Sequence, residues 1–300
     1  MLQEKIFRMG IVEMIRAAET TLPDDVVKAI ELCRERETLK IARVQLECML
    51  ENLKLARKFR SPICQDTGTF IFFLKLGSEI RLGFDPKKCI QEAVVEATSE
   101  VPLRPNVVDP LTRRNTGDNS GEGQPEVYAE LSRGEEVKVE LLVKGAGSEN
   151  WGRLYMLRPG EGVEAIKNAV IKTISEARGQ PCPPTIVGLG IGGSASEACI
   201  LAKRALLTPL NKRNPNPKLA KLEREVEVEA NKLGIGPMGL GGKCTVLGVR
   251  SAIAACHTAS LPLAISFQCW AARRASARFS KNGFEIEVPE RRAVRWARSS

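Results

Sequence analysis

Three of the nine cysteines occupy positions where a thiolate could point into a shared cavity. Cys64 lies in SPICQDTG, Cys182 in QPCPP and Cys269 in SFQCWAARRA, and each is at the edge of an apolar strand or in a proline-rich turn. The sequence contains no CxxC pair, which argues against a zinc ribbon or finger. The wide spacing of these cysteines along the sequence is not evidence that they share a site. For each of them, a buried and unreactive side chain is the ordinary alternative to a functional role.

Charged side chains in several loops could bind an anion. Arg104 lies in PLRPN, and Lys144 precedes GAGSEN. A guanidinium group suits a carboxylate because its planar fork binds both oxygens, although a solvated basic surface is the alternative. Asp66, Asp109 and Asp118 lie in similar loops, where capping of a turn is a common role for aspartate.

The glycines of GLGIGG follow the GxGxxG spacing of a dinucleotide site, between a predicted strand and a predicted helix. Such a site also needs an acidic residue about 20 positions later, at the end of the next strand. The corresponding region reads LLTPLNKRNP, which has no acid. We therefore interpret these glycines as a tight turn that allows a strand and a helix to pack closely.

The composition favours an anionic partner without identifying it. The chain of 300 residues carries 45 Lys and Arg against 36 Asp and Glu, a formal net charge of +9. Aromatic residues are only 5%, which leaves little material for stacking nucleic-acid bases. The single histidine, His257, excludes any site that needs two imidazoles.

The cysteines outside the three loops are expected to be unreactive. Four of them lie in predicted helices and are expected to be buried: Cys33, Cys48, Cys89 and Cys199.

No apolar run approaches the roughly 18 residues of a membrane helix, and the first stretch lacks the apolar core of a signal peptide. We therefore expect a cytoplasmic protein, in which reducing conditions argue against disulfide bonds.

The hydrophobic spacing places helices and strands around these residues. Apolar positions recur at helical intervals through residues 1–60, which predicts three helices there. The same criteria predict helices at 86–99 and 160–177, and strands at 68–77, 137–143, 185–189 and 284–288. Residues 101–125 lack periodicity but carry apolar residues, which favours an ordered functional loop. The segment 219–234 fits either a charged surface helix or an exposed strand.

These elements predict a mixed α/β (α+β) fold. N-terminal helices would pack around β-sheets, with the functional groups where loops converge. No linker divides the sequence, so we expect one domain over residues 1–290, whose first 60 residues are helical. Residues 291–300 would form a basic C-terminal tail without motifs.

Six motifs, taken in order, resemble one known family. They are PICQDTG, RPNVVDPLTRRNTGDN, KGAGSEN, CPPTIVGLGIGG, GPMGLGGKCTVLGV and HTASLPLAISFQCWAARRA. They are similar to the α-subunit, or N-terminal domain, of the iron–sulfur class of fumarate hydratases and L-tartrate dehydratases. The resemblance implies an oxygen-sensitive hydro-lyase with a [4Fe–4S] cluster on Cys64, Cys182 and Cys269. Three protein ligands leave one iron open, and an open iron can act as a Lewis acid on the substrate.

The resemblance also assigns roles around the cluster. Asp66 resembles the catalytic acid that protonates the leaving hydroxyl, and His257 resembles the active-site histidine that tunes this acid. Gln65 resembles a substrate contact, and Arg104 resembles the arginine that clamps a substrate carboxylate.

The KGAGSEN loop both follows and departs from the family. The backbone amides of Gly145 and Gly147 resemble substrate contacts. Ala146 replaces a usual glycine, and Trp151-Gly152 replaces a smaller or more flexible pair. These departures leave the choice of substrate open.

The implied reaction is reversible hydration of fumarate to (S)-malate, and conversion of L-tartrate to oxaloacetate is the alternative. A non-catalytic protein that binds anions or nucleic acid, and an NAD-dependent oxidoreductase, are rivals from other classes.

In the family a second domain supplies the base for the C–H proton, and no segment here resembles it. The resemblance therefore implies a separate β-subunit, in an α2β2 assembly that acts on a small dicarboxylate and not on nucleic acid or membrane.

Overall fold

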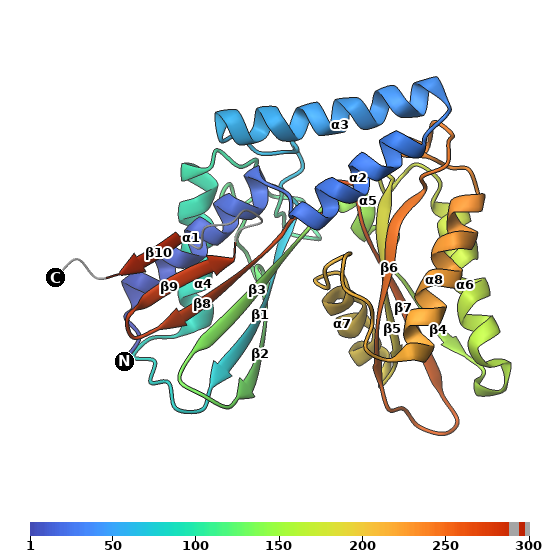
Figure 1. Ribbon diagram of the computed structural model, residues 1–300. Coiled ribbons are helices and arrows are strands. Elements are labelled where there is room, and N and C mark those ends of the chain that lie inside the picture. Colours follow the sequence, from blue (N-terminus) through green and yellow to red (C-terminus); the bar gives the residue numbers. More distant parts are fainter. Residues whose placement is uncertain (288–293, 298–300) are drawn as a thin grey trace. The chain divides into compact units, whose positions relative to one another are not determined.

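The computed structural model describes residues 1–287 and 294–297, which form two units, each built on its own β-sheet (Figure 1). The first unit comprises Met1–Asp24, Asn52–Lys144 and Arg273–Ser300, and the second comprises Asp25–Glu51 and Gly145–Ala272. The chain crosses between the units at residues 24, 51, 144 and 272. Within the described ranges, none of the helices combines the length and the hydropathy that a membrane span requires.

A six-stranded mixed sheet of order β10-β9-β8-β3-β1-β2 forms the first unit. Its strands are β1 (Thr69–Gly77), β2 (Glu126–Ser132), β3 (Val137–Lys144), β8 (Arg274–Ser280), β9 (Gly283–Glu287) and β10 (Val294–Ala297). Helices α1 (Glu4–Thr20) and α4 (Pro86–Glu100) pack against each other and share one apolar core with the sheet. The remaining tail residues, 291–293 and 298–300, lie outside the described residues.

A four-stranded sheet of order β4-β7-β5-β6 forms the second unit. Its strands are β4 (Arg153–Leu157), β5 (Thr185–Gly192), β6 (Val246–Ala254) and β7 (Leu261–Gln268). Its helices are α2 (Asp24–Arg36), α5 (Ala146–Glu149), α6 (Gly162–Ala177), α7 (Ala195–Ala205) and α8 (Pro217–Lys232), with 3₁₀ turns at Pro159–Glu161 and Pro237–Gly239. Helix α3 (Lys40–Phe59) begins in this unit and ends in the first. Helices α6 and α8 share the core of the sheet, whereas α7 packs on β5, β6 and β7 (Figure 1).

The mixed α/β fold and the three N-terminal helices are confirmed. Residues 219–234 are helical through Lys232 as part of α8, because Leu222, Val226 and Ala230 recur every four residues on its buried side. Residues 246–266 contain two strands, β6 and β7, joined by an exposed turn. The sheets and helices therefore agree with the expected fold class. The conformation of the segments between them became clear only from the three-dimensional structure.

Gly188, Gly190 and Gly192 of GLGIGG lie inside β5, whereas Gly193 follows the strand in a bend with a φ of +70°. A Cβ atom on Gly188 would meet the carbonyl oxygen of Ala202, and one on Gly190 would meet that of Ala198. Both oxygens belong to α7, so only glycine allows the helix to approach the strand this closely. Close strand–helix packing is confirmed, and it accounts for these two glycines of the GxGxxG pattern.

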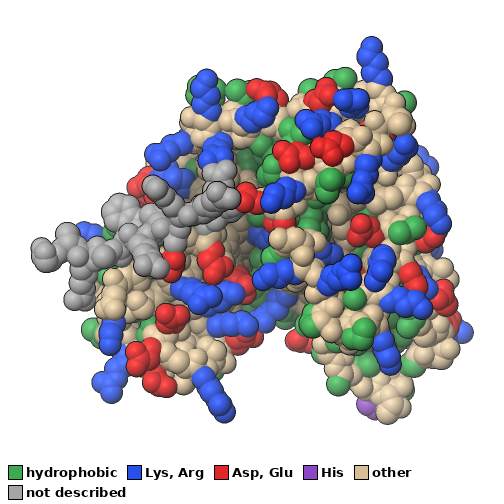
Figure 2. All heavy atoms as spheres, viewed as in Figure 1, with side chains coloured by type: hydrophobic (Ala, Val, Ile, Leu, Met, Phe, Trp, Pro, Cys, Tyr) green, Lys and Arg blue, Asp and Glu red, His purple; other side chains and the backbone are tan. Residues whose placement is uncertain are grey.

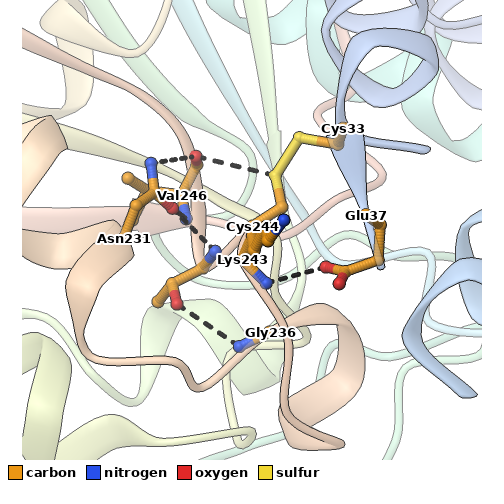
Figure 3. Close-up of a disulfide and its surroundings, with 8 residues drawn as sticks. Cys33, Glu37, Asn231, Gly236, Lys243, Cys244 and Val246 are labelled. Carbon is orange, nitrogen blue, oxygen red and sulfur yellow. Dashed lines mark hydrogen bonds between the residues drawn. A yellow bond between two sulfur atoms is a disulfide. The ribbon is translucent and has the colours of Figure 1, made fainter. Parts of the chain in front are cut away.

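A disulfide bond joins Cys33 of α2 to Cys244 in the second unit (Figure 3). The expectation that the chain has no disulfide is therefore wrong. The two residues are 211 positions apart, but the fold brings their Cα atoms to 5.9 Å, which is within the disulfide range. A hydrogen bond from the backbone N–H of Lys243 to the Glu37 carboxylate, at 2.7 Å, ties the same helix end to the same loop.

The other helical cysteines differ in exposure. Cys89 is buried as expected, but Cys48 and Cys199 are exposed, contrary to the expectation. Each of these two cysteines lies on the solvent-facing side of its helix. The spacing of the apolar residues predicted the helices but did not show that these cysteines lie on the exposed side. Both exposed thiols offer matched controls for substitutions elsewhere.

Cys33→Ser is expected to lower the free energy of unfolding of the oxidised chain by about 2–4 kcal/mol, since the disulfide closes a long loop in the unfolded state. Chemical denaturation without reductant measures this loss, and thiol counting checks that the bond is present. Cys199→Ser, at an exposed thiol, is the control and should leave the unfolding curve unchanged. Equal stability of Cys33→Ser and the unmodified chain would contradict a stabilising bond.

Candidate functional site

The segment 63–66, which carries the first predicted cluster ligand, lies between α3 and β1 in the first unit. Its position is fixed at Ile63. The Ile63 N–H donates to the carbonyl oxygen of Glu19 at 2.8 Å, and the Ile63 carbonyl accepts from Nδ2 of Asn52 at 2.9 Å. The end of α1 and the last turns of α3 thus hold the start of the segment from both sides.

Asp66 is held by hydrogen bonds at one carboxylate oxygen. Its Oδ1 accepts from the N–H of Gly68 at 2.9 Å and from Nδ2 of Asn106 at 3.0 Å. The backbone N–H of Asp66 donates to the half-buried sulfur of Cys64 at 3.4 Å. Cys64 and Asp66 are therefore adjacent in a fixed geometry, whereas Gln65 between them is exposed.

The buried side chain of Asn119 makes several of the hydrogen bonds that order the aperiodic loop 101–125. Its Oδ1 accepts from the backbone N–H of Asn106 at 2.7 Å, and its Nδ2 donates to the carbonyl oxygen of Arg104 and to Oγ1 of Thr98, both at 3.2 Å. Asn119 has a φ of +60°, a left-handed conformation that asparagine adopts more readily than most residues. The backbone of the exposed Arg104 is thus fixed close to the residue that contacts Asp66.

Asp109 and Asp118 cap turns in the same loop. Oδ1 of Asp109 accepts from the N–H groups of Leu111 and Thr112, at 3.0 and 2.6 Å. The hydrogen bonds from Thr112 hold the pKa of Asp109 below its usual range. Oδ1 of Asp118 accepts from the N–H of Ser120 at 3.0 Å. Turn capping, the alternative considered for both aspartates, is what the structure shows.

A buried ion pair involves Glu19, the residue that also holds Ile63. Its Oε2 accepts from Nη1 of Arg273 at 2.6 Å, and both side chains are at most 1% exposed. Burial raises the pKa of Glu19 to about 7, the nearby Arg273 opposes this shift, and the charge of Asp66 adds to it. The first unit therefore contains a second carboxyl group within electrostatic reach of Asp66.

Cys182 and Cys269 come together at one end of the four-stranded sheet. Cys182 lies just before β5 and Cys269 just after β7, and the antiparallel pairing of these strands places Ile186 opposite Gln268. The N–H of Trp270 donates to the carbonyl oxygen of Cys182 at 3.1 Å. Cys182 has a φ of +54°, a conformation that a residue with a side chain rarely adopts and that is concentrated at functional sites. Both thiols are half-buried.

Two glycine-containing loops pack against the turn that precedes Cys182. A Cβ atom on Gly147 would lie 3.0 Å from the carbonyl oxygen of Gln180. A Cβ atom on Gly179 would lie 3.0 Å from the Cα atom of Gly239. The KGAGSEN and GPMGLGG motifs, which are far apart in the sequence, therefore meet at the turn that carries one predicted ligand.

The residues that depart from the family support the same turn. Nε1 of Trp151 donates to Oε1 of Gln180 at 3.1 Å, and the guanidinium of Arg153 lies 4.6 Å from the ring centroid of Trp151. Gly145 precedes the short helix α5, and its carbonyl accepts from Oγ of Ser148 at 2.9 Å. The loop that contains Gly145 and Gly147 is thus shaped by contacts near Cys182.

His257 lies at the other end of the same sheet. It is in the exposed turn between β6 and β7, and its Nδ1 accepts from the N–H of Ala259 at 3.1 Å. Gly192, the last residue of β5, pairs with Ala254, the last residue of β6. The length of β5, roughly 25 Å for eight residues, therefore separates this turn from Cys182. The structure does not bring His257 together with the two cysteines of its own unit.

The three predicted ligands are divided between the units, with Cys64 in the first and Cys182 and Cys269 in the second. Among the side chains that the structure describes, no group of three or more His, Cys, Asp or Glu is arranged to hold a metal ion. The donor chemistry nevertheless fits an iron–sulfur cluster, because all three are half-buried thiols and thiolates are the ligands of such clusters.

The net charge does not form one basic patch on the face shown in Figure 2. Lys and Arg side chains are interspersed there with Asp and Glu. A protein that binds nucleic acid through its charge usually gathers Lys and Arg on one face or along one helix. This face offers no observation in favour of the nucleic-acid rival.

Comparison with known proteins gives a consistent result. Residues 9–278 match the family model described as "Fumarate hydratase (Fumerase)". A protein of Methanocaldococcus jannaschii with the provisional name L(+)-tartrate dehydratase subunit alpha is 47% identical over 272 residues, which cover 89% of this chain and 95% of that protein. The L(+)-tartrate dehydratase subunit alpha of Escherichia coli UTI89 is 38% identical over 260 residues, 86% of each chain. That of Escherichia coli O157:H7 is 39% identical over 256 residues, 85% of this chain and 84% of the relative.

Proposed function

The chain belongs to the fumarate hydratase family, and on this basis we propose that it is the α-subunit of a hydro-lyase that acts on a small dicarboxylate. The contacts around Asp66 carry the proposal. This carboxyl group lies beside the predicted ligand Cys64 and is oriented by Asn106, which belongs to the loop that carries Arg104. One unit thus contains an acid that can protonate a leaving hydroxyl, a thiol that can hold a cluster and a guanidinium group that can bind a carboxylate, and together these groups suit dehydration of a hydroxydicarboxylate.

In this proposal Cys64, Cys182 and Cys269 hold a [4Fe–4S] cluster. When bound, the cluster supplies a Lewis-acidic iron, and the reaction needs no change of oxidation state. Two features support the ligand set: the three half-buried thiols, and the hydrogen bond from Trp270 that joins the segments of Cys182 and Cys269.

Asp66 donates a proton to the departing hydroxyl oxygen, and in the direction of hydration it accepts a proton from water. The hydrogen bonds at Oδ1 keep its carboxyl group in one orientation during this transfer. Arg104 binds one carboxylate of the substrate through both oxygens. Gln65 adds a further contact to the substrate, since it is exposed beside Asp66.

The second unit adds backbone contacts in this proposal. The amides of Gly145 and Gly147 contact the substrate, in a loop that packs beside Cys182. The tuning of Asp66 by His257 stays a prediction from the motif resemblance, since His257 lies at the far end of β5 from Cys182. His257→Asn tests this role through the activity of the complete enzyme.

L(+)-Tartrate is the substrate that the names of the relatives favour. Its dehydration yields the enol of oxaloacetate, which rearranges to the ketone. Fumarate, the substrate expected from the motif resemblance, is the second candidate. The description of the family model supports it. The two reactions share one mechanism and differ in one hydroxyl group, which a polar contact in the pocket can discriminate.

A separate β-subunit completes the enzyme. The relatives are named as alpha subunits, which supports a partner of this kind. The β-subunit supplies the base that removes the C–H proton, and the assembly is α2β2. The α-subunit alone is then expected to bind substrate poorly and to show little turnover.

The substrate test uses the chain purified with its β-subunit under anaerobic conditions. We expect kcat/KM for L-tartrate to exceed that for fumarate by about tenfold or more, a difference of about 1.4 kcal/mol in transition-state binding. Oxaloacetate formation and malate formation measure the two reactions. Preference for fumarate would assign the second candidate, and an iron-loaded complex without either activity would contradict the proposed function.

A further inference from the structure

Asn119 connects the backbone of Arg104 to that of Asn106, the residue that contacts Asp66. Its side chain is 1% exposed and uses both ends of the amide. Nδ2 donates to the carbonyl oxygen of Arg104, and Oδ1 accepts from the backbone N–H of Asn106. The distances are 3.2 and 2.7 Å. One buried amide therefore fixes the backbone on both sides of Pro105.

Asn106 extends this link to Asp66. Its backbone is held by Asn119, while its Nδ2 donates to Oδ1 of Asp66 at 3.0 Å. The same oxygen accepts from the N–H of Gly68 at 2.9 Å. Two donors on one oxygen define the plane of the carboxyl group, because hydrogen bonds to a carboxylate lie near that plane.

Helix α4 anchors the network. Nδ2 of Asn119 also donates to Oγ1 of Thr98, and Oγ1 of Thr98 lies 2.8 Å from the carbonyl oxygen of Val94 in the same helix. Thr98 and Val94 are buried in the core of the first unit. Helix α4 therefore helps to fix the position of Asn119, and through Asn119 the spacing between Arg104 and Asp66.

We propose that Asn106 and Asn119 are positioning residues of the hydro-lyase reaction: Asn106 orients the Asp66 carboxyl group, and Asn119 sets the spacing between Asp66 and the carboxylate-binding Arg104. This inference rests on the proposed function. A short dicarboxylate bound at Arg104 presents its hydroxyl to Asp66 only at one spacing, so the network selects substrate length. Displacement of a reacting group by about 1 Å can cost about 100-fold in rate.

Asn106→Ala is expected to lower kcat about 10- to 100-fold, with KM changed less than about twofold. Asn119→Asp keeps the acceptor for Asn106 but removes the donors to Arg104 and Thr98. It should therefore raise KM about tenfold, a weakening of carboxylate binding, with a smaller change in kcat. A purely structural role would not separate the two kinetic constants in this way.

A double-substitution cycle gives the decisive measurement on the α–β complex. In an Asp66→Asn background, Asn106→Ala should cause no further loss of kcat, because its effect passes through Asp66. Losses that multiply would overturn the positioning role. Iron content and thermal unfolding are measured for each variant, and Asn282→Ala, at an exposed turn of the same unit, is the matched control.

The two proposals fail in different ways. If the unmodified complex turns over neither L-tartrate nor fumarate, the proposed function is wrong. If the unmodified complex is active and Asn106→Ala keeps its full kcat, the function stands and the positioning role is wrong. If Asn119→Asp fails to fold, the half-buried Asn106 and its cycle with Asp66 still decide the inference.

Discussion

Serine in place of Cys182 is expected to leave the chain without bound iron and the complex without turnover. The hydrogen bond from Trp270 holds the backbone of Cys182 beside the Cys269 segment, and the proposed cluster needs the sulfur of Cys182 at this position. A serine hydroxyl does not replace it, because iron–sulfur clusters are held by thiolates and an alcohol ionises far less readily. Iron and acid-labile sulfide per chain, after anaerobic reconstitution, measure the loss.

The same result is expected for Cys64→Ser and Cys269→Ser. Cys199→Ser should load iron normally, because Cys199 is an exposed thiol on α7 outside the predicted ligand set. Cys48→Ser, also exposed, repeats this control on α3. Normal iron content in a chain that lacks all three predicted ligands would end the cluster proposal.

Asp66→Asn is expected to lower kcat by about 10²–10⁴ without loss of iron, since this is the usual contribution of a general acid or base. Asparagine has the shape of aspartate and keeps an oxygen that can accept from Gly68 and Asn106. It cannot supply a carboxylic proton. Steady-state turnover of the complex, normalised to iron content, isolates the chemical effect.

Asp109→Asn is the matched control for the acid. Asp109 lies in an exposed turn of the same unit and caps that turn through Leu111 and Thr112. Its substitution should leave kcat close to that of the unmodified complex. Full activity of Asp66→Asn would place the acid on another residue.

The parts of the fold that local periodicity determines were predictable. The apolar spacing of the first 60 residues gives three helices, and the apolar run at 69–77 gives a strand that is buried along most of its length. The charged segment 219–234 was ambiguous because its charges hide the helical repeat of Leu222, Val226 and Ala230, which only burial reveals.

The candidate site was predictable only where a motif carries the chemistry. Cys64 and Asp66 follow from one motif, and the structure places them side by side. Asn106 and Asn119 were missed, although they stand at positions 3 and 16 of RPNVVDPLTRRNTGDN, because the roles of their amides depend on a loop conformation without periodicity. The Cys33–Cys244 bond was missed for a related reason, since tertiary proximity across 211 residues has no local signature.

The order of the chain in the first unit has a consequence for its synthesis on the ribosome. Strand β3 pairs with β8, and β8, β9 and Arg273 all come from the segment that follows residue 272. Glu19 is translated 254 positions before this arginine, which becomes its counter-charge. A nascent chain therefore holds an incomplete sheet and an acid without its cation until residues 273–287 have been translated, and a chain stopped before Arg273 would keep both defects.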